Sequence, residues 1–569
     1  MFHTTARRKI KMGVRSVSEV EEAGTPVDPQ SAEVDTFVGQ IGASALKLIG
    51  EMSELSAPDS LPPNACEGPQ VAEVGSGSLD DDVTRPRPAP SPSMLATPLP
   101  RRQRNRRVAI GLLTGAVVIA AVAGFTLYAR GSQVTGPLPA AGPKIAAAGQ
   151  VLASGSSSAP LPTAAGLAQA LAKPLKQANL GQHVSVAVTD MSTGKLLFGS
   201  NATSPTTPAS TMKLATTVSL LATRGPNYRI TTHAVAGPLP GEVVLVGAGD
   251  PTLGATSVPT YPESGTLVQL AAQVRQALGS VKPTRVIVDA SLYPGSSRGP
   301  GWQDADIDSQ YLSRVYALAT DAGRINPANH GDAPRYKNSA TSAGDIFASL
   351  LGLSATAVVN GKAPKATAST APPTSPGAVL GSVQSAPLVR IIETMLSTSD
   401  NMLAENMARQ VAIATGYPAS FAGAAAAVTA ELTKLGMPMQ GVHIVDGSGI
   451  SHQNRLTPTL LAAVMSYASQ PSHPSLHALL TSLPVAGYSG TLIHRFKGAG
   501  TTNADGMLRA KTGTLNGVTA LAGYVIDDSG RPLLLVVLLD KTPWTGAPAA
   551  VDKIGSAVRA CGCGSPAGS

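Results

Sequence analysis

Cysteine, aromatic residues and charge are all scarce in this chain of 569 residues: it has 3 cysteines, 4% aromatic residues and 14% charged residues. Three cysteines cannot build a disulfide framework for so long a chain, and Cys66, Cys561 and Cys563 lack the paired spacing of a structural zinc site. Lys and Arg form no stripe with interleaved aromatic residues, which argues against nucleic-acid binding despite a net charge of +8. We therefore expect a globular protein of several structural units, with no metal, no cofactor and no nucleic-acid partner.

Residues 108–129 form an apolar run without a charged residue, long enough at 1.5 Å per residue to cross the roughly 30 Å of hydrocarbon in a bilayer. Five arginines lie within 101–107, whereas only Arg130 follows the run closely. The positive-inside rule then predicts a single-pass protein of the cell membrane, with a cytoplasmic N-terminus and an extracytoplasmic catalytic part. A buried core helix and a cleaved signal peptide are the alternatives.

The segments on either side of this run read as irregular chain. Residues 1–107 mix both charges with Pro- and Ser-rich patches and are predicted to be a cytoplasmic, mostly disordered tail. Met94 stands just before the arginines and is an alternative start. Residues 130–162 are rich in Gly, Ala, Ser and Pro and are predicted to be an extracytoplasmic stalk. The folded part is therefore expected to begin near Thr163.

Hydrophobic periodicity predicts alternating helices and strands beyond Thr163. A segment rich in Ser, Thr, Pro and Gly at 360–382 interrupts the pattern. The expected elements are helices at 163–180 (interrupted at Pro174), 213–222, 388–396, 401–415 and 549–560, and strands at 183–190, 195–199, 242–249, 284–290, 519–527 and 532–540.

The first candidate for chemistry is Ser210-Thr211-Met212-Lys213, which lies between a turn-rich segment and an apolar helical run. Ser210 is expected at a helix N-terminus, and Lys213 falls one turn later on the same face. A lysine can take the proton of a serine hydroxyl only if its pKa is lowered by burial or by a second cation. Alone, this spacing more often means a helix cap and a solvated lysine.

Two further motifs follow in order. Ser399-Asp400-Asn401 begins a second helical pattern, and Lys511-Thr512-Gly513 precedes two apolar strands. Together the three motifs match the SxxK, SDN and KTG signature of penicillin-recognising serine enzymes. A helix cap and a strand-entry turn are the ordinary readings of the second and third motifs, but the joint match makes chance improbable.

On these residues the chain resembles the low-molecular-mass penicillin-binding proteins of the DacB type, D-alanyl-D-alanine carboxypeptidases and endopeptidases. The resemblance covers about 163–560. Ala248, where glycine is common, and His452, where arginine is common, depart from the family's pattern. The blocks that carry the resemblance, besides the three motifs, are GAGDPTL (247–253), SDNMLAENMAR (399–409), DGSGISHQNRLTP (446–458) and LPVAGYSGTL (483–492).

The resemblance implies an α+β fold, an α/β sandwich in which a β-lactamase-like antiparallel sheet is flanked by helices. Residues 163–249 and 382–569 would form the catalytic domain. Since Ser210 and Ser399 are 189 positions apart, more than a compact domain of this kind needs, the sequence predicts inserted domains. The resemblance places them at 250–381 as β-rich accessory lobes.

The resemblance also implies a mechanism on a peptidoglycan stem peptide ending in D-Ala-D-Ala. Ser210 would attack the carbonyl of the penultimate D-Ala, with Lys213 as general base, and form an acyl-enzyme. Ser399 would pass a proton to the leaving amine, and Asn401 would hydrogen-bond Lys213 and the substrate. Lys511 would supply positive potential that lowers the pKa of Lys213 and attracts the substrate carboxylate.

Thr512, Gly513 and Thr514, which follow Lys511, are the substrate-binding residues that the resemblance implies. Thr512 would bond the same carboxylate, and the backbone amides of Ser210 and Thr514 would form the oxyanion hole. β-Lactam antibiotics are the expected inhibitors, and peptidoglycan and the membrane are the expected partners.

Two rival functions share parts of this signature. A class A β-lactamase adds a glutamate that activates the deacylating water, and Glu-x-x-Leu-Asn does not occur between Ser399 and Lys511. A non-catalytic envelope scaffold or sensor could dispense with the nucleophile or the lysines, whereas this chain keeps Ser210, Lys213 and Lys511. Both alternatives are weaker than the peptidase.

Overall fold

The computed structural model describes residues 155–307, 309–366, 372–543 and 545–562, in which the chain forms two five-stranded β-sheets. The first sheet has the strand order β2-β1-β10-β9-β8, and all neighbouring strands are antiparallel. Its strands are β1 (His183–Asp190), β2 (Leu196–Ser200), β8 (Leu508–Leu515), β9 (Val518–Ile526) and β10 (Pro532–Asp540).

Strand β10 lies at the centre of this sheet and is buried on both faces. It pairs with β1, from the other end of the folded chain, with Val186 opposite Val537. Its odd-numbered residues from Leu533 to Leu539 join one hydrophobic core, and its even-numbered residues from Leu534 to Leu538 join another. Successive side chains of a strand point to opposite faces, so a central strand between two cores is apolar at nearly every position.

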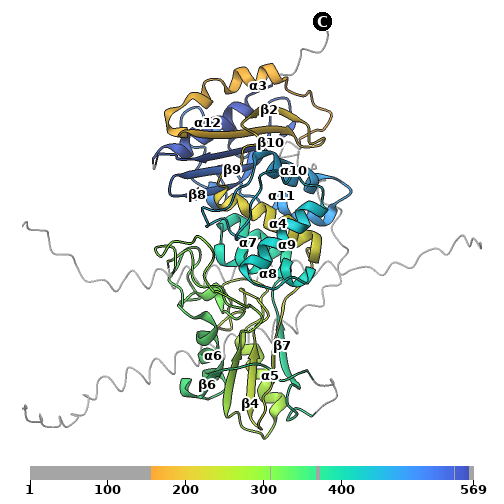
Figure 1. Cartoon of the computed structure of the whole chain (residues 1–569), viewed down its shortest axis with the longest axis vertical. Coiled ribbons are helices and arrows are strands. Elements are labelled where there is room, and N and C mark those ends of the chain that lie inside the picture. Colours follow the sequence, from red (N-terminus) through yellow and green to blue (C-terminus); the bar gives the residue numbers. More distant parts are fainter. Residues whose placement is uncertain (1–154, 308, 367–371, 544, 563–569) are drawn as a thin grey trace, which may run out of the picture. The chain divides into compact units, whose positions relative to one another are not determined.

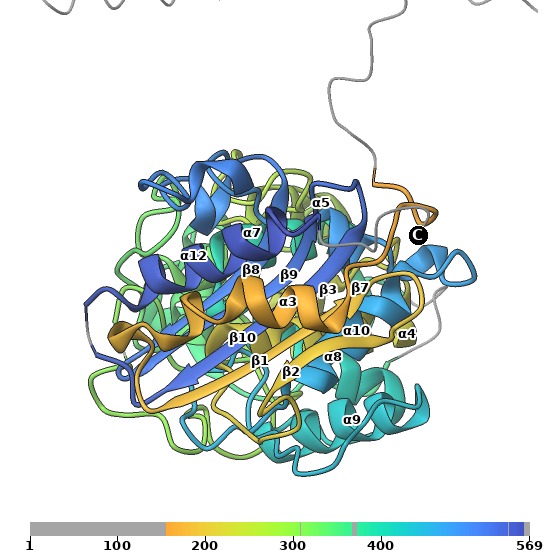
Figure 2. The same ribbon diagram turned by 90° about the horizontal axis from the view of Figure 1, so that it is seen from above.

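Helices cover both faces of the first sheet. Helices α3 (Ala164–Leu171) and α12 (Ala547–Arg559) lie across one face, as Figure 2 shows, where Leu167 and Ile554 are buried against the strands. The other face packs on a helical core. Its helices are α4 (Met212–Arg224), α7 (Leu388–Thr398), α8 (Asn401–Thr415), α9 (Phe421–Lys434), α10 (Pro458–Ser469) and α11 (Ala478–Thr481).

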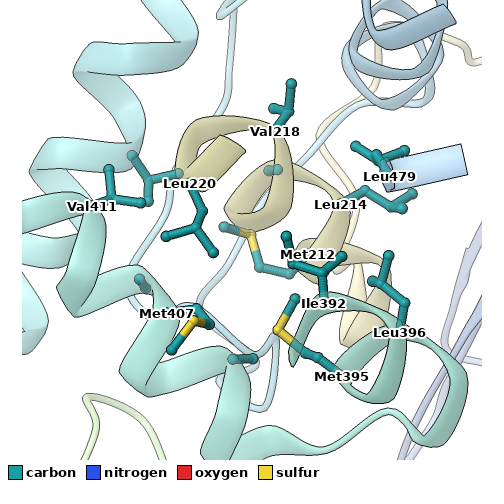
Figure 3. Close-up of a cluster of buried hydrophobic side chains, with 14 of the residues drawn as sticks. Met212, Leu214, Val218, Leu220, Ile392, Met395, Leu396, Met407, Val411 and Leu479 are labelled. Atoms are coloured by element: carbon teal, nitrogen blue, oxygen red, sulfur yellow. The ribbon is translucent and has the colours of Figure 1, made fainter. Parts of the chain in front are cut away.

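Helix α4, which carries Lys213, lies in the middle of this helical core. Figure 3 shows side chains of α4 in contact with side chains of α7, α8 and α11. Met212, Leu214 and Leu220 of α4 are fully buried. A close-packed surrounding of this kind leaves little room for α4 to shift, so the backbone that carries the SxxK motif is held rigidly.

The second sheet has the strand order β6-β5-β4-β3-β7 and is mixed, because β4, β5 and β6 run parallel to one another. Parallel neighbours need long crossover connections, and helices α5 (Leu267–Leu278) and α6 (Ser339–Leu350) occur in them. The strands are β3 (Thr231–Ala236), β4 (Glu242–Val246), β5 (Arg285–Asp289), β6 (Val358–Asn360) and β7 (Val379–Gln384).

This part of the chain therefore differs from the β-rich lobes expected at 250–381: it is one α/β unit with its own core between α5, α6 and the sheet (Figure 1). Strands β3 and β4 of its sheet precede residue 250, so the sheet starts earlier in the chain than the expected insertion. The sequence pattern shows short strands and helices separated by turns. It does not show which strand pairs with which. The domain boundaries themselves stay a prediction.

Most of the expected elements are present. The predicted hairpins form as β1 with β2 and as β9 with β10, and α3, α4, α7, α8 and α12 occupy the predicted helical segments. Helices α5, α6, α9 and α10 were not predicted, although α10 carries the Thr457 cap and Pro458 start of a typical helix. Short 3-10 helices outside the site are η1 (Pro174–Lys176), η2 (Ala178–Leu180), η4 (Asp321–Gly323), η5 (Ala355–Ala357), η6 (Pro474–Leu476) and η8 (Thr502–Ala504).

The predicted tail at 1–107, the predicted membrane segment at 108–129 and most of the predicted stalk at 130–162 lie outside the described residues. Among the helices that are described, none combines the length and the apolarity needed to cross a bilayer.

Candidate active site

Ser210 lies in a 3-10 helix, η3 (Ala209–Thr211), that runs directly into α4 and so places Lys213 one turn further on. The residue before the serine, Ala209, has a positive φ of 45°, a conformation that is strained for any residue except glycine and often occurs at functional sites. A side chain at Gly449 would collide with the Ala209 carbonyl oxygen. The turn at Gly449 therefore packs directly against the backbone that presents Ser210.

The amine of Lys213 is buried and meets three oxygen atoms. Its Nζ lies 2.9 Å from Ser210 Oγ, 2.7 Å from Asn401 Oδ1 and 2.9 Å from the carbonyl oxygen of Ser448. Burial lowers the pKa of Lys213 to about 8, although the nearby carboxylates, Glu405 first among them, act to raise it. Near pH 8 about half of this lysine is therefore the neutral amine that a general base must be.

The two other partners fix the direction of the lone pair on that neutral amine. The Asn401 side chain donates through Nδ2 to the Tyr311 carbonyl oxygen at 3.1 Å, so its Oδ1 faces Lys213. Asn401 Oδ1 and the Ser448 carbonyl oxygen can only accept hydrogen bonds. When the two hydrogens of the neutral amine go to these acceptors, its lone pair faces Ser210 Oγ.

Ser399-Asp400-Asn401 forms the junction between α7 and α8. Ser399 ends α7 with a positive φ of 63°, and Asn401 is the first residue of α8. Between them Asp400 caps α8 by accepting from the backbone amides of Met402 and Leu403. This sharp junction lets Ser399 line the cavity while Asn401 reaches Lys213.

Lys511 lies on strand β8, so the strand-entry turn that was the ordinary alternative reading of its motif does not form there. Its side chain is fully buried, and its Nζ donates to the carbonyl oxygen of Thr512 at 2.7 Å. Burial, and next the charge of Lys213, lower the pKa of Lys511 well below its ordinary range. The charge of Lys213 therefore disfavours protonation of Lys511.

The following residues of β8 face the nucleophile. The Thr512 hydroxyl donates to the Thr491 hydroxyl at 2.7 Å, at the 3-10 helix η7 (Gly490–Leu492). A side chain at Gly513 would meet the Pro208 carbonyl oxygen at 2.9 Å. Glycine at this position lets β8 approach the turn before Ser210, which brings Thr514 to the wall of the same cavity.

A cavity of about 580 Å³ joins these groups. Residues from the segment between the first two motifs supply part of its wall, including the carboxylic acids Asp306 and Asp332. The residues that line the cavity are Ser210, Gln303, Ala305, Asp306, Tyr311, Asp332, Thr398, Ser399, Asn401, Ile450, His452, Thr491, Thr512, Thr514, Leu515 and Asn516.

The structure thus gathers the predicted site residues in one place. Ser210, Lys213 and Asn401 are joined by hydrogen bonds; Ser399, Thr512 and Thr514 line the cavity with Ser210; Lys511 and Gly513 lie directly behind it on β8. Their catalytic roles stay predictions.

Sequence reasoning missed two contributors. The Ser448 carbonyl is a backbone group and has no sequence signature. Thr491 lies in the LPVAGYSGTL block, which carried the resemblance but suggested no role. Asp446 lies in the turn that carries Ser448, and its carboxylate accepts from the Gly449 and Ser451 amides.

Comparison with known proteins identifies the family. The family model described as the D-Ala-D-Ala carboxypeptidase 3 (S13) family matches residues 167–357 and 329–558. Carboxypeptidase DacB of Mycolicibacterium smegmatis is 38% identical over 474 residues, covering 82% of this chain and 99% of that protein. Carboxypeptidase Rv3627c of Mycobacterium tuberculosis is 38% identical over 436 residues, covering 76% of this chain and 91% of that protein.

The fold agrees with this assignment. The crystal structure of penicillin-binding protein 4 (dacB) from Haemophilus influenzae matches with a TM-score of 0.54 at 21% identity, covering 70% of this chain and 98% of that one. The predicted antiparallel sheet flanked by helices is thus confirmed, and it has the fold of a penicillin-binding protein. The family resemblance found in the motifs is confirmed as well. The chain belongs to the D-Ala-D-Ala carboxypeptidase 3 (S13) family.

Proposed function

We propose that this chain is a penicillin-sensitive serine D-Ala-D-Ala carboxypeptidase acting on peptidoglycan stem peptides. The observation that carries the proposal is the contact of the buried, partly neutral Lys213 amine with Ser210 Oγ, at the wall of a cavity large enough for a peptide end. A hydroxyl paired with a base in this way is the arrangement that nucleophilic catalysis requires. The names of the relatives, which are carboxypeptidases, support the same reaction.

In the acylation step Ser210 Oγ forms a bond to the carbonyl carbon of the penultimate D-Ala while Lys213 takes the hydroxyl proton. The tetrahedral intermediate carries its negative charge on oxygen, between the backbone amides of Ser210 and Thr514. The C–N bond then breaks, and Ser399, whose side chain lines the cavity, relays a proton to the departing amine of D-Ala. Water next attacks the ester, returns the proton to Ser210 and releases the shortened peptide.

The carboxylate of the terminal D-Ala is bound, in this proposal, at the exposed end of β8. Thr512 lines the cavity, and the buried Lys511 amine donates to the Thr512 carbonyl oxygen directly behind it. An endopeptidase reaction on a cross-linked peptide would use the same acyl-enzyme. It differs only in the group that leaves, so the proposal includes it as a second activity of one site.

The proposal is tested by measuring the intact mass of the chain from residue 155 onward after incubation with benzylpenicillin. A long-lived adduct of one drug mass should form, Ser210→Ala should form none, and Ser204→Ala, which changes an exposed serine of the preceding turn, should react like the parent. The same preparations should release D-Ala from a stem pentapeptide, and a cross-linked dimer measures the endopeptidase activity.

Other results of this experiment would indicate another function or another nucleophile. Rapid drug hydrolysis without a lasting adduct indicates a β-lactamase. A folded protein that neither binds the drug nor releases D-Ala indicates a non-catalytic envelope protein, and an adduct that persists in Ser210→Ala assigns the nucleophile to another residue.

We further propose that residues 108–129 anchor the protein in the cell membrane, with the N-terminus in the cytoplasm and the catalytic part outside. The apolar length of this segment and the arginines before it support the proposal. The full chain should sediment with membranes and be released by detergent but not by high salt, and deletion of 1–130 should make it soluble. Release of the full chain by salt alone would contradict an anchor.

A further inference from the structure

A buried carboxylate that the reaction above does not use lies next to the general base. Glu405 follows Asn401 by one turn of α8, and its side chain is only 1% exposed. Its Oε1 accepts from the Ser448 amide at 2.8 Å and from the Gly447 amide at 3.1 Å. The carbonyl of that same Ser448 accepts from Lys213. Glu405 and Lys213 therefore hold the two sides of one short turn.

Other contacts fix the turn 446–451 against the same two helices. Thr216 of α4 donates to the Gly447 carbonyl oxygen at 2.7 Å. A side chain at Gly447 would collide with Ala408 of α8, so the backbone lies directly on that helix. Asp446 closes the turn through the Gly449 amide at 2.8 Å. In this arrangement Glu405 accepts two backbone amides of the turn, while Lys213 donates to a carbonyl of the same turn.

We propose that Glu405 is a positioning residue for the general base: by accepting the Gly447 and Ser448 amides it holds the Ser448 carbonyl on Lys213 Nζ and so keeps the lone pair of that amine directed at Ser210. The inference rests on the proposed function, because it assigns Glu405 a part in the same acylation step. Loss of the Ser448 contact would free one hydrogen of the neutral amine, and the lone pair would no longer have a single direction.

The charge of Glu405 adds a second effect on Lys213. Burial, and next the charge of Asp446, raise the pKa of Glu405 to about 7, and among the carboxylates it is the first to raise the pKa of Lys213. Removing this negative charge should lower the pKa of Lys213 further. The charged and titratable groups that face Glu405 are Lys213 of α4, Arg409 of α8, Asp446 of the turn and Tyr293 from the segment after β5.

The dependence of the acylation rate on pH follows from the protonation of Lys213. Acylation needs neutral Lys213, so its rate rises with pH and levels off above the pKa of Lys213, with a midpoint near 8 in the parent protein. In Glu405→Gln the midpoint should move to lower pH because the charge is lost. The plateau should fall about ten- to a hundredfold because glutamine replaces Oε2, which accepts from the Gly447 amide at 3.2 Å, by a donor NH2 group, and because the hydrogen bonds to the turn lose the charge that strengthens them. The turn, and with it the base, is then misaligned.

The experiment measures the second-order rate of acylation by benzylpenicillin from about pH 6 to about pH 10, the range around the lysine pKa. Glu405→Asp keeps the charge but shortens the side chain, so it should lower the plateau and leave the midpoint in place. Glu431→Gln is the matched control: Glu431 is a buried glutamate of α9 paired with Lys434, and its replacement should change neither quantity.

The outcomes are separable. A parent protein that is not acylated contradicts the proposed function itself. A parent that is acylated, with a Glu405→Gln variant of the same midpoint and plateau, overturns the inference. If Glu405→Gln does not fold, as judged by circular dichroism, Glu405→Asp decides: a lower plateau supports the positioning role, and an unchanged plateau overturns it.

Discussion

Replacement of Lys213 by methionine is expected to slow acylation of Ser210 by about a thousandfold, within the range that general-base catalysis contributes. Methionine has a similar length and suits the buried site, so the fold should persist. The variant removes the hydrogen-bond donor shared by Asn401 and the Ser448 carbonyl and leaves the serine proton without an acceptor. The measurement is the rate of appearance of the benzylpenicillin adduct by mass spectrometry.

Lys434→Met is the control for this variant. Lys434 is a lysine of α9 whose side chain is 72% exposed, so its loss should leave acylation unchanged. A loss of less than tenfold in Lys213→Met, in a protein with the melting temperature of the parent, would assign the general base to another group. Lys511 would then be the next candidate, because burial, the largest cause of its lowered pKa, persists in the variant.

The second large effect is expected on stability. Asp400→Asn should lower the free energy of unfolding by about 3 kcal/mol, the cost of leaving buried charges without a partner. Asp400 Oδ2 accepts from Arg324 Nη2 at 2.9 Å and from the Tyr261 hydroxyl at 3.0 Å, and Arg335 lies 3.7 Å away. Asparagine caps helices as well as aspartate does, so the loss measures the ion pairs rather than the cap of α8. Urea denaturation gives the free energy.

The pH dependence of this difference is a further check on the same variant. Burial alone would raise the pKa of Asp400, but Arg335 and then Arg324 outweigh it and the pKa falls to about 2. The ion pairs therefore stabilise the folded protein above the ordinary aspartate pKa, and the stabilisation is lost as pH falls toward 2. The parent and Asp400→Asn should converge in that range.

Asp304→Asn serves as the comparison, because Asp304 pairs with Arg298 while its side chain is 92% exposed. Exposed ion pairs contribute little, and the variant should unfold like the parent. An Asp400→Asn protein as stable as the parent at neutral pH would show that Arg324 and Arg335 find other partners.

The motifs predicted the centre of this site because each is a local pattern. Ser210 and Lys213 are three residues apart at a helix start, so one turn brings them together, and Asn401 begins a helix whose cap could be seen in the sequence. The two predicted hairpins formed for the same reason. Where the interacting groups are close in the chain, residue spacing and the alternation of apolar and polar residues are enough to predict their contact.

The remaining contacts join distant segments and backbone atoms. The Ser448 carbonyl is 235 positions from Lys213, and Arg324 is 76 positions from Asp400; no periodicity links such pairs. The Ala-rich helix α9 lacks the polar face that would mark it as amphipathic. The mixed order of the second sheet depends on crossovers, which strand patterns alone do not specify.

The pairing of β1 with β10 has a consequence for how the enzyme matures. Contacts between segments this far apart form late, because a long loop must close first. The second sheet, made only of residues 231–384, can form as soon as that stretch is available, whereas the central strand of the first sheet comes from 532–540. Ser210 and Lys511 therefore come together only after synthesis has passed residue 540. A chain that is only partly synthesised carries the nucleophile without an assembled site.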